Sequence, residues 1–155
     1  MSGPLALPTT LLEEIYRHAR ETFPRECCGY IVGAGDAAKL VRCLNRQDVL
    51  HEQDPVTYPR TAETAYQIAG RELLALVRSF DSEEPATVIY HSHPRVGAYF
   101  SDEDTRAAVS AGYPVAYLVV DVQDKGIPES RLFERDPDTE PPRYREVARF
   151  DGADI

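Results

Sequence analysis

The spacing of hydrophobic residues predicts a helix at the beginning of the chain. Apolar side chains recur at positions that fall on one helical face. Thr10 and Glu13 form the S/T-x-x-E pattern of a capping box, which predicts that the helix begins at Thr10, and Pro24 ends it. The residues that share the apolar face are Leu12, Ile15, Tyr16 and Ala19.

Two further helices are predicted. The first covers residues 62–78, where apolar residues again form a stripe with helical spacing. The second covers residues 101–111, with Ser101 as its N-cap. Asp102, Glu103 and Asp104 fill the first turn of that helix, where negative charge interacts favourably with the helix dipole. The apolar stripe of the 62–78 segment consists of Ala65, Ile68, Ala69, Leu73, Leu76 and Val77.

Short β-branched and aromatic runs predict strands between these helices. The strongest pattern for a central strand is residues 87–90, Thr-Val-Ile-Tyr. A hairpin is expected before it, and residues 45–60 are expected to form an irregular loop. Irregular alternation of strands and helices predicts an α/β or α+β domain with a mixed sheet. The other predicted strands are 29–33 and 39–44 in the hairpin, 115–122, 131–135, and 144–150 as an edge strand or a tail.

Length and charge then restrict the classes of function. The chain has 155 residues, which fits a single domain, and a formal net charge of −9. Phosphate backbones and anionic lipid surfaces attract basic proteins, so the acidic balance argues against nucleic acid and membrane partners. The first ten residues carry no positively charged stretch or long apolar run, so we expect no signal peptide and a cytoplasmic protein.

The three cysteines do not predict a disulfide framework. Cys27 and Cys28 are neighbours, and neighbouring cysteines rarely bridge without strain. Any pairing leaves one cysteine over. We therefore expect Cys27, Cys28 and Cys43 to be reduced thiols, most of them buried, in a reducing compartment.

The candidate chemistry lies in residues 90–104. His91 and His93 are two residues apart at the end of the predicted strand, so their side chains point to the same face. Asp104 lies in the first turn of the next predicted helix, and the loop before that helix can bring its carboxylate back over the two histidines. Two imidazoles and one carboxylate are a common zinc ligand set that leaves a fourth position open for water. A His-x-His pair alone is more often incidental, and an aspartate at a helix start is ordinary capping chemistry; the joint spacing with Ser101 strengthens the prediction.

Two motifs resemble those of the JAMM (MPN-plus, Mov34/MPN/PAD) metalloproteases. The segment beginning at His91 is His-Ser-His-Pro, followed by six residues, Ser101, two residues and Asp104. Upstream, residues 24–29 match Pro-x-Glu-x-Cys-Gly at every defined position. The resemblance covers about residues 5–135, which leaves 136–155 as a C-terminal extension, and is strongest for the small single-domain bacterial and archaeal members, including those that process sulfur carriers.

The resemblance implies a fold and a mechanism. The fold would be a curved mixed β-sheet flanked by helices, similar to that of the cytidine deaminases. One zinc ion per chain would be bound by His91, His93 and Asp104. Glu26 would be the general base, and Ser101 would help to hold the oxyanion. The implied reaction is hydrolysis of the peptide or isopeptide bond after the C-terminal Gly-Gly of a ubiquitin-like or sulfur-carrier protein.

The same residues allow other interpretations. Without its motif, Glu26 would be taken for a surface carboxylate, and Asp102 is a rival ligand that breaks the spacing. A catalytically inactive MPN-type scaffold is the alternative function, although such relatives typically lose part of the ligand set that this chain retains. A nucleobase deaminase would need a Cys-x-x-Cys motif, which is missing. The sequence leaves the oligomeric state open, a homodimer included.

Four remaining residues receive minor roles. Cys28 is expected to be a small buried residue beside the site rather than a ligand. His18 and His51 are expected to be bystanders. Tyr58, with the 45–60 loop, is a weaker candidate for the wall of a substrate groove.

Overall fold

A six-stranded mixed sheet organises the chain. The computed structural model describes residues 7–155, so the predicted core boundary at residue 5 lies outside the described part. The strand order is β2-β1-β3-β4-β5-β6. The strands are β1 (Cys28–Val32), β2 (Lys39–Cys43), β3 (Ala86–Pro94), β4 (Ala116–Gln123), β5 (Gly126–Asp136) and β6 (Arg143–Ala153).

One strand pair is parallel. β3 and β4 run in the same direction, whereas the other neighbouring strands are antiparallel. A parallel pair needs a crossover connection, and here that connection contains α4 (Asp102–Ala111). The mixed α+β fold predicted from the sequence is confirmed, and so is the hairpin of β1 and β2.

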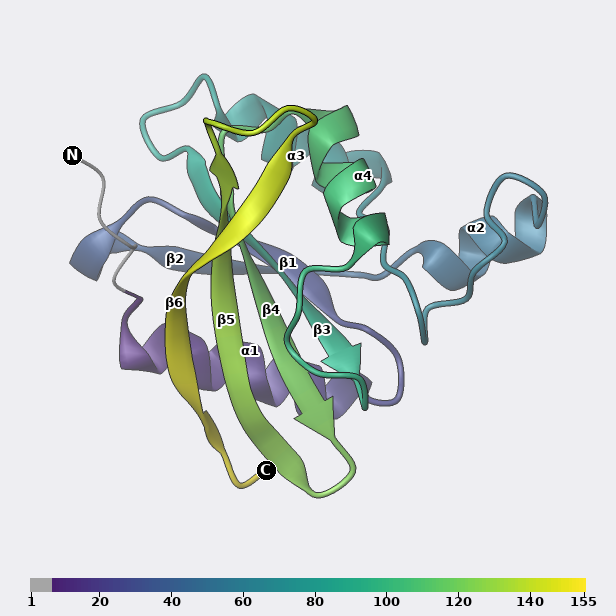
Figure 1. Cartoon of the computed structure of the whole chain (residues 1–155), viewed down its shortest axis with the longest axis horizontal. Coiled ribbons are helices and arrows are strands. Elements are labelled where there is room, and N and C mark those ends of the chain that lie inside the picture. The colour runs from purple at the N-terminus through teal and green to yellow at the C-terminus, as the bar shows by residue number, and fades with distance from the viewer. Residues whose placement is uncertain (1–6) are drawn as a thin grey trace.

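Helices lie on both faces of the sheet (Figure 1). α1 (Thr9–Thr22) runs across one face, while α3 (Gly70–Ser79) and α4 lie on the other side of the strands. The short α2 (Gln47–Gln53) projects away from the sheet. A 3₁₀ turn, η1 (Gly35–Ala37), closes the hairpin. No helix within residues 7–155 is long and apolar enough to cross a membrane.

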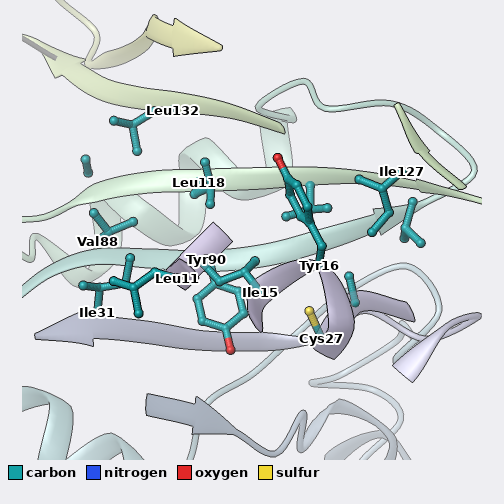
Figure 2. Packing of buried hydrophobic residues seen from close by; sticks show 14 residues of the cluster. Leu11, Ile15, Tyr16, Cys27, Ile31, Val88, Tyr90, Leu118, Ile127 and Leu132 are labelled. Atoms are coloured by element: carbon teal, nitrogen blue, oxygen red, sulfur yellow. The ribbon is translucent and has the colours of Figure 1, made fainter. Parts of the chain in front are cut away.

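The main core fills the space between α1 and the sheet (Figure 2). Ile15 and Ala19 of α1 are fully buried there, as are Tyr90 of β3, Leu118 of β4 and Leu132 of β5. A second cluster, which includes Ile89 and Tyr117, lies under α3 and α4 on the opposite face. The sheet is therefore covered on both sides, which keeps β3 and its neighbours out of water.

The C-terminal residues are part of this sheet. β6 pairs with β5 along its length, and Phe150 packs against the main core. Tyr16 of α1 donates a hydrogen bond to the Asp151 carbonyl (2.8 Å) and accepts one from the Ser130 hydroxyl (2.7 Å). Of the two alternatives for residues 144–150, the edge strand is the correct one.

The first helix begins one residue earlier than predicted. α1 begins at Thr9, its N-cap is Pro8, and no side chain caps it. The predicted capping box of Thr10 and Glu13 is therefore wrong, because Thr10 already lies inside the first turn.

The second predicted helix is too long. Residues 62–69 are not helical, and α3 begins only at Gly70, which has a φ of +61°. Main-chain groups of the 62–69 segment bond to distant partners instead, among them Glu26 and Asn45. The predicted loop at 45–60 needs a correction too, since it contains α2.

Candidate metal centre

β3 places both histidines on the same face of the sheet. His91 and His93 are buried, and Ser92 between them points to the opposite face, where its hydroxyl accepts a hydrogen bond from the Cys27 amide at 2.8 Å. β4 pairs with both histidines and β1 pairs with His91, so neighbouring strands hold this end of β3 in place. The alternation of a buried strand thus fixes two imidazoles side by side.

Asp104 completes a tight cluster of three donor groups. Its carboxylate lies 3.2 Å from Nε2 of His91 and 3.1 Å from Nε2 of His93. The two Nε2 atoms are themselves 3.1 Å apart. Asp104 is held there by its place in the first turn of α4, where it forms a capping box with Ser101. The structure therefore brings together the three residues that the sequence predicts as ligands.

This donor set fits a small divalent cation. Ligand atoms bonded to zinc at about 2.0–2.1 Å in a tetrahedron are spaced by roughly 3.3 Å, close to the separations in this cluster. Nδ1 of His93 is hydrogen-bonded to the Gly97 carbonyl at 3.0 Å, which leaves the Nε2 lone pair facing the other two groups. The ring of His91 stacks on Tyr66 at 4.4 Å between centroids, and its buried Nδ1 has no partner within residues 7–155.

At His91 and Asp104 the electrostatics favour the protonation states that metal binding needs. Burial lowers the pKa of His91, which favours the neutral imidazole. Burial opposes ionisation of Asp104, but His91 and His93 beside it outweigh that effect and hold its pKa well below its usual range. Neutral imidazoles and an ionised carboxylate are the forms that ligate a cation.

Glu26 lies next to the same cluster. A carboxylate oxygen of Glu26, one ring nitrogen of His91 and one ring nitrogen of His93 form a group. These three atoms all lie within 4.8 Å of one another. The Glu26 side chain is buried, with only 5% of the residue exposed. Burial, together with the negative charge of Asp104, raises the pKa of Glu26 to about 9, and Arg60 opposes this shift. A cation held by the histidines would favour the ionised carboxylate.

An open cavity of about 750 Å³ leads to these groups. Glu26, His93, Ser101 and Asp104 are among the residues that line it. Tyr58, the predicted groove wall, also lines the cavity. The remaining walls carry mixed chemistry, contributed among others by Arg60, Tyr66, Val96, Tyr99 and Arg106.

The residues expected to be bystanders lie outside the cluster. Nδ1 of His18 is hydrogen-bonded to the Tyr90 hydroxyl at 2.7 Å, and Nδ1 of His51 to the Tyr58 carbonyl at 2.7 Å. Asp102 is exposed on α4, unlike Asp104. Cys28 is a buried thiol whose pKa is raised by burial, and its Sγ donates to the Leu44 carbonyl at 3.7 Å.

Two residues around the site were not singled out by the sequence. Tyr66, the stacking partner of His91, falls within the segment predicted to be helical. Asn45 begins the segment predicted to be a loop, and its side chain contacts the main chain of Glu26. Neither lies in a recognisable motif, because their partners come from distant parts of the chain.

Comparison with known proteins shows the family to which the chain belongs. Residues 8–134 match the family model of the prokaryotic homologues of the JAB domain. The chain belongs to the prokaryotic JAB family. This confirms the resemblance to JAMM and MPN proteins that the two motifs indicated.

Relatives of this prokaryotic JAB protein include named peptidases. The CysO-cysteine peptidases of Mycobacterium tuberculosis and Mycobacterium bovis are 28% identical to it over 130 residues, which cover 83% of this chain and 81% of theirs. The fold also matches solution structures of a Desulfitobacterium hafniense protein and a Salinibacter ruber protein. The Desulfitobacterium hafniense protein has a TM-score of 0.62 and 21% identity, and the match covers 94% of this chain and 92% of that one. The Salinibacter ruber protein has a TM-score of 0.55 and 19% identity, and the match covers 91% of this chain and 87% of that one.

Proposed function

We propose that this prokaryotic JAB protein is a zinc-dependent metalloprotease. It hydrolyses the peptide or isopeptide bond that follows the C-terminal Gly-Gly of a ubiquitin-like or sulfur-carrier protein. The observation that carries the proposal is the cluster of His91, His93 and Asp104, whose donor atoms lie 3.1–3.2 Å apart beside the buried Glu26.

One zinc ion per chain would be held by His91, His93 and Asp104, where it would polarise the scissile carbonyl and lower the pKa of water to about 7. Glu26 is adjacent to these ligands and is the residue that takes a proton from water and delivers it to the leaving amine. A cation beside Glu26 would offset the burial that raises its pKa, which favours the ionised carboxylate that a general base needs near neutral pH.

Ser101 has a hydrogen available for the oxyanion. Its Oγ accepts a hydrogen bond from the Asp104 amide at 3.0 Å, so the hydroxyl hydrogen itself is free to donate. Ser101 also lines the cavity with Glu26 and His93. The same hydroxyl thus serves as helix cap and as donor towards the developing negative charge.

The substrate class is supported by the relatives. The mycobacterial proteins are named as peptidases that act on CysO-cysteine, and the alignment with them covers four-fifths of both chains. A sulfur-carrier protein is therefore the partner proposed here. Its Gly-Gly tail would lie extended in the cavity, since glycines allow a main chain to come close to buried groups.

The test is cleavage of a defined substrate by the zinc-loaded protein. We would use a sulfur-carrier protein ending in Gly-Gly extended by one cysteine, and the same protein joined to a lysine side chain, with products identified by mass spectrometry. We expect about one zinc per chain and cleavage directly after the second glycine.

The matched control is Glu26→Gln, which is nearly isosteric. It should keep its zinc and lose activity by a factor of about 10²–10⁴, as expected for a missing general base. No zinc uptake and no cleavage of either substrate would instead support the scaffold alternative. Unchanged turnover in Glu26→Gln would remove Glu26 from the mechanism.

A further inference from the structure

The side chain of Asn45 joins three segments around the candidate site. Nδ2 donates to the carbonyls of Glu26 (2.8 Å) and Ala65 (3.0 Å). Oδ1 accepts from the amides of Gln47 (3.0 Å) and Gln67 (3.2 Å). Because two carbonyls face one end of the amide and two N–H groups the other, only one orientation of the side chain satisfies all four bonds. The hydrogen-bonding capacity of Asn45 is thus fully used.

The segment on one side of Asn45 carries Glu26. Glu26 precedes β1 and lies outside the pairing of the sheet. Its amide donates to the Ala62 carbonyl at 2.7 Å, and its carbonyl accepts from Asn45. The main chain of Glu26 is therefore held on both sides by groups outside the sheet, and Asn45 supplies one of the two.

The segment on the other side carries Tyr66. Asn45 binds the carbonyl of Ala65 and the amide of Gln67, which flank Tyr66 in the chain. The Arg46 amide reinforces this link by donating to the Gln67 carbonyl at 2.9 Å. The ring of Tyr66 stacks on His91 with an angle of 21° between the planes. Asn45 therefore sets the distance between the Glu26 main chain and the segment that covers a predicted ligand.

We propose that Asn45 is a positioning residue for hydrolysis, which acts by fixing Glu26 relative to the histidine cluster. This inference rests on the proposed function, because it assigns to Glu26 the role of base. Catalysis is sensitive to such placement, since a displacement of about 1 Å can cost about 10²-fold in rate. Loss of the Asn45 amide removes one partner from the Glu26 carbonyl and, at the same time, one each from the Ala65 carbonyl and the Gln67 amide.

The first experiment compares Asn45→Ala with Asn45→Asp. The aspartate keeps an acceptor for Gln47 and Gln67 but faces the carbonyls of Glu26 and Ala65 without a donor. We expect both variants to keep their zinc and to lose about 10–100-fold in kcat with less than about threefold change in KM. Thr87→Val is the matched control, because it removes a side-chain bond to a carbonyl (Gly33, 2.9 Å) elsewhere in the sheet. It should keep the wild-type kcat.

The second experiment separates positioning from a general structural role. In a Glu26→Gln background, Asn45→Ala should lower the residual rate by less than about twofold, because the residue through which it acts is already disabled. A further loss equal to that in the wild-type background would overturn the proposal. So would a wild-type kcat in Asn45→Ala.

A third measurement does not need activity. Amide hydrogen exchange followed by NMR should show faster exchange at Glu26 and Gln67 in Asn45→Ala, and unchanged exchange in the core of β4. Unaltered exchange at Glu26 would overturn the positioning role. If the wild-type protein cleaves no Gly-Gly substrate, the proposed function fails by itself. The exchange result then still decides whether Asn45 holds Glu26 in place.

Discussion

Ser101 and Asp104 cap each other at the start of α4. The Ser101 hydroxyl accepts from the Asp104 amide at 3.0 Å, and Oδ2 of Asp104 accepts from the Ser101 amide at 3.1 Å. The same Oδ2 lies 3.1 Å from Nε2 of His93. The helix cap and the proposed metal ligand are therefore one carboxylate, so the local rule that begins the helix also aims Asp104 at the histidines.

Ser101→Ala should separate the two roles of this serine. We expect a loss of about 1 kcal/mol in the free energy of unfolding, because the cap to Asp104 is gone. The loss in kcat should be larger, about 10²–10³-fold, as for removal of an oxyanion donor. Urea unfolding and substrate kinetics measure the two effects. Ser110→Ala, at the exposed end of the same helix, is the control. A kcat loss no larger than the stability effect explains would count against the oxyanion role.

Asp104→Asn should weaken zinc binding by more than about 100-fold. The amide keeps an oxygen that can cap α4 but loses the negative charge and one lone-pair oxygen. Removing a residue that only hydrogen-bonds to a metal ligand lowers the metal affinity about 10–100-fold, so removing a ligand should lower it more. Competition with a chelator measures the affinity, and Asp102→Asn in the same turn should leave it unchanged. Equal effects of the two substitutions would contradict the choice of Asp104 as the ligand.

His18 should make the stability depend on pH in the mildly acidic range. Burial and the positive charge of Arg42 lower the pKa of His18 from its ordinary 6.5 to about 4, and the negative charge of Glu21 partly opposes this shift. The unfolded chain thus binds more protons between pH 4 and 6.5, so this contribution to stability is complete above pH 6.5 and is lost as the pH falls to about 4. Its size is about 1–2 kcal/mol for a partly accessible ring.

The variant that tests this dependence is His18→Gln. Its free energy of unfolding should fall less steeply than that of the wild type between pH 6.5 and 4, measured by urea unfolding at several pH values. Parallel curves for the two proteins would show that His18 titrates normally in the folded state.

Gly29→Ala should destabilise the fold by about 1–3 kcal/mol, as overpacked cores do. A Cβ at this position would lie 2.5 Å from the Tyr90 hydroxyl and 2.5 Å from the Val41 carbonyl. The carbonyl belongs to β2 and cannot move without disturbing the pairing with β1. Combining Gly29→Ala with Tyr90→Phe should therefore restore only part of the loss. Thermal unfolding decides this, and a variant as stable as the wild type would show that the close approach is not rigid.

Local patterns predicted that His91, His93 and Asp104 lie close together. The two-residue spacing of His91 and His93 depends only on strand geometry, and the Ser101 to Asp104 pair only on helix capping, so both could be derived from short segments. Thr10 and Glu13 show the same capping pattern without forming a cap, because Pro8 already begins the helix. A motif of four residues therefore does not fix a helix start when a neighbouring residue competes for it.

Distant contacts were harder to predict. The spacing of Ala65, Ile68 and Ala69 fits a helix, yet this segment is not helical, and its main-chain groups bond to Asn45 and Arg46. Those partners lie far away in sequence, and a periodicity argument contains no information about them. For the same reason the sequence pointed to Glu26 only through its motif, and it gave no sign of the residues that bond to the Glu26 main chain.

The two halves of the site differ in how far apart their residues lie in the sequence. His93 and Asp104 are 11 residues apart in the sequence. Cys27, next to Glu26, contacts Ser92 of β3, which is 65 residues away in the sequence. Contacts that close short loops form early in folding, and those that close long loops form late. A newly made chain would thus bring together its proposed metal ligands before its proposed general base. It could hold a cation while still unable to cut a bond.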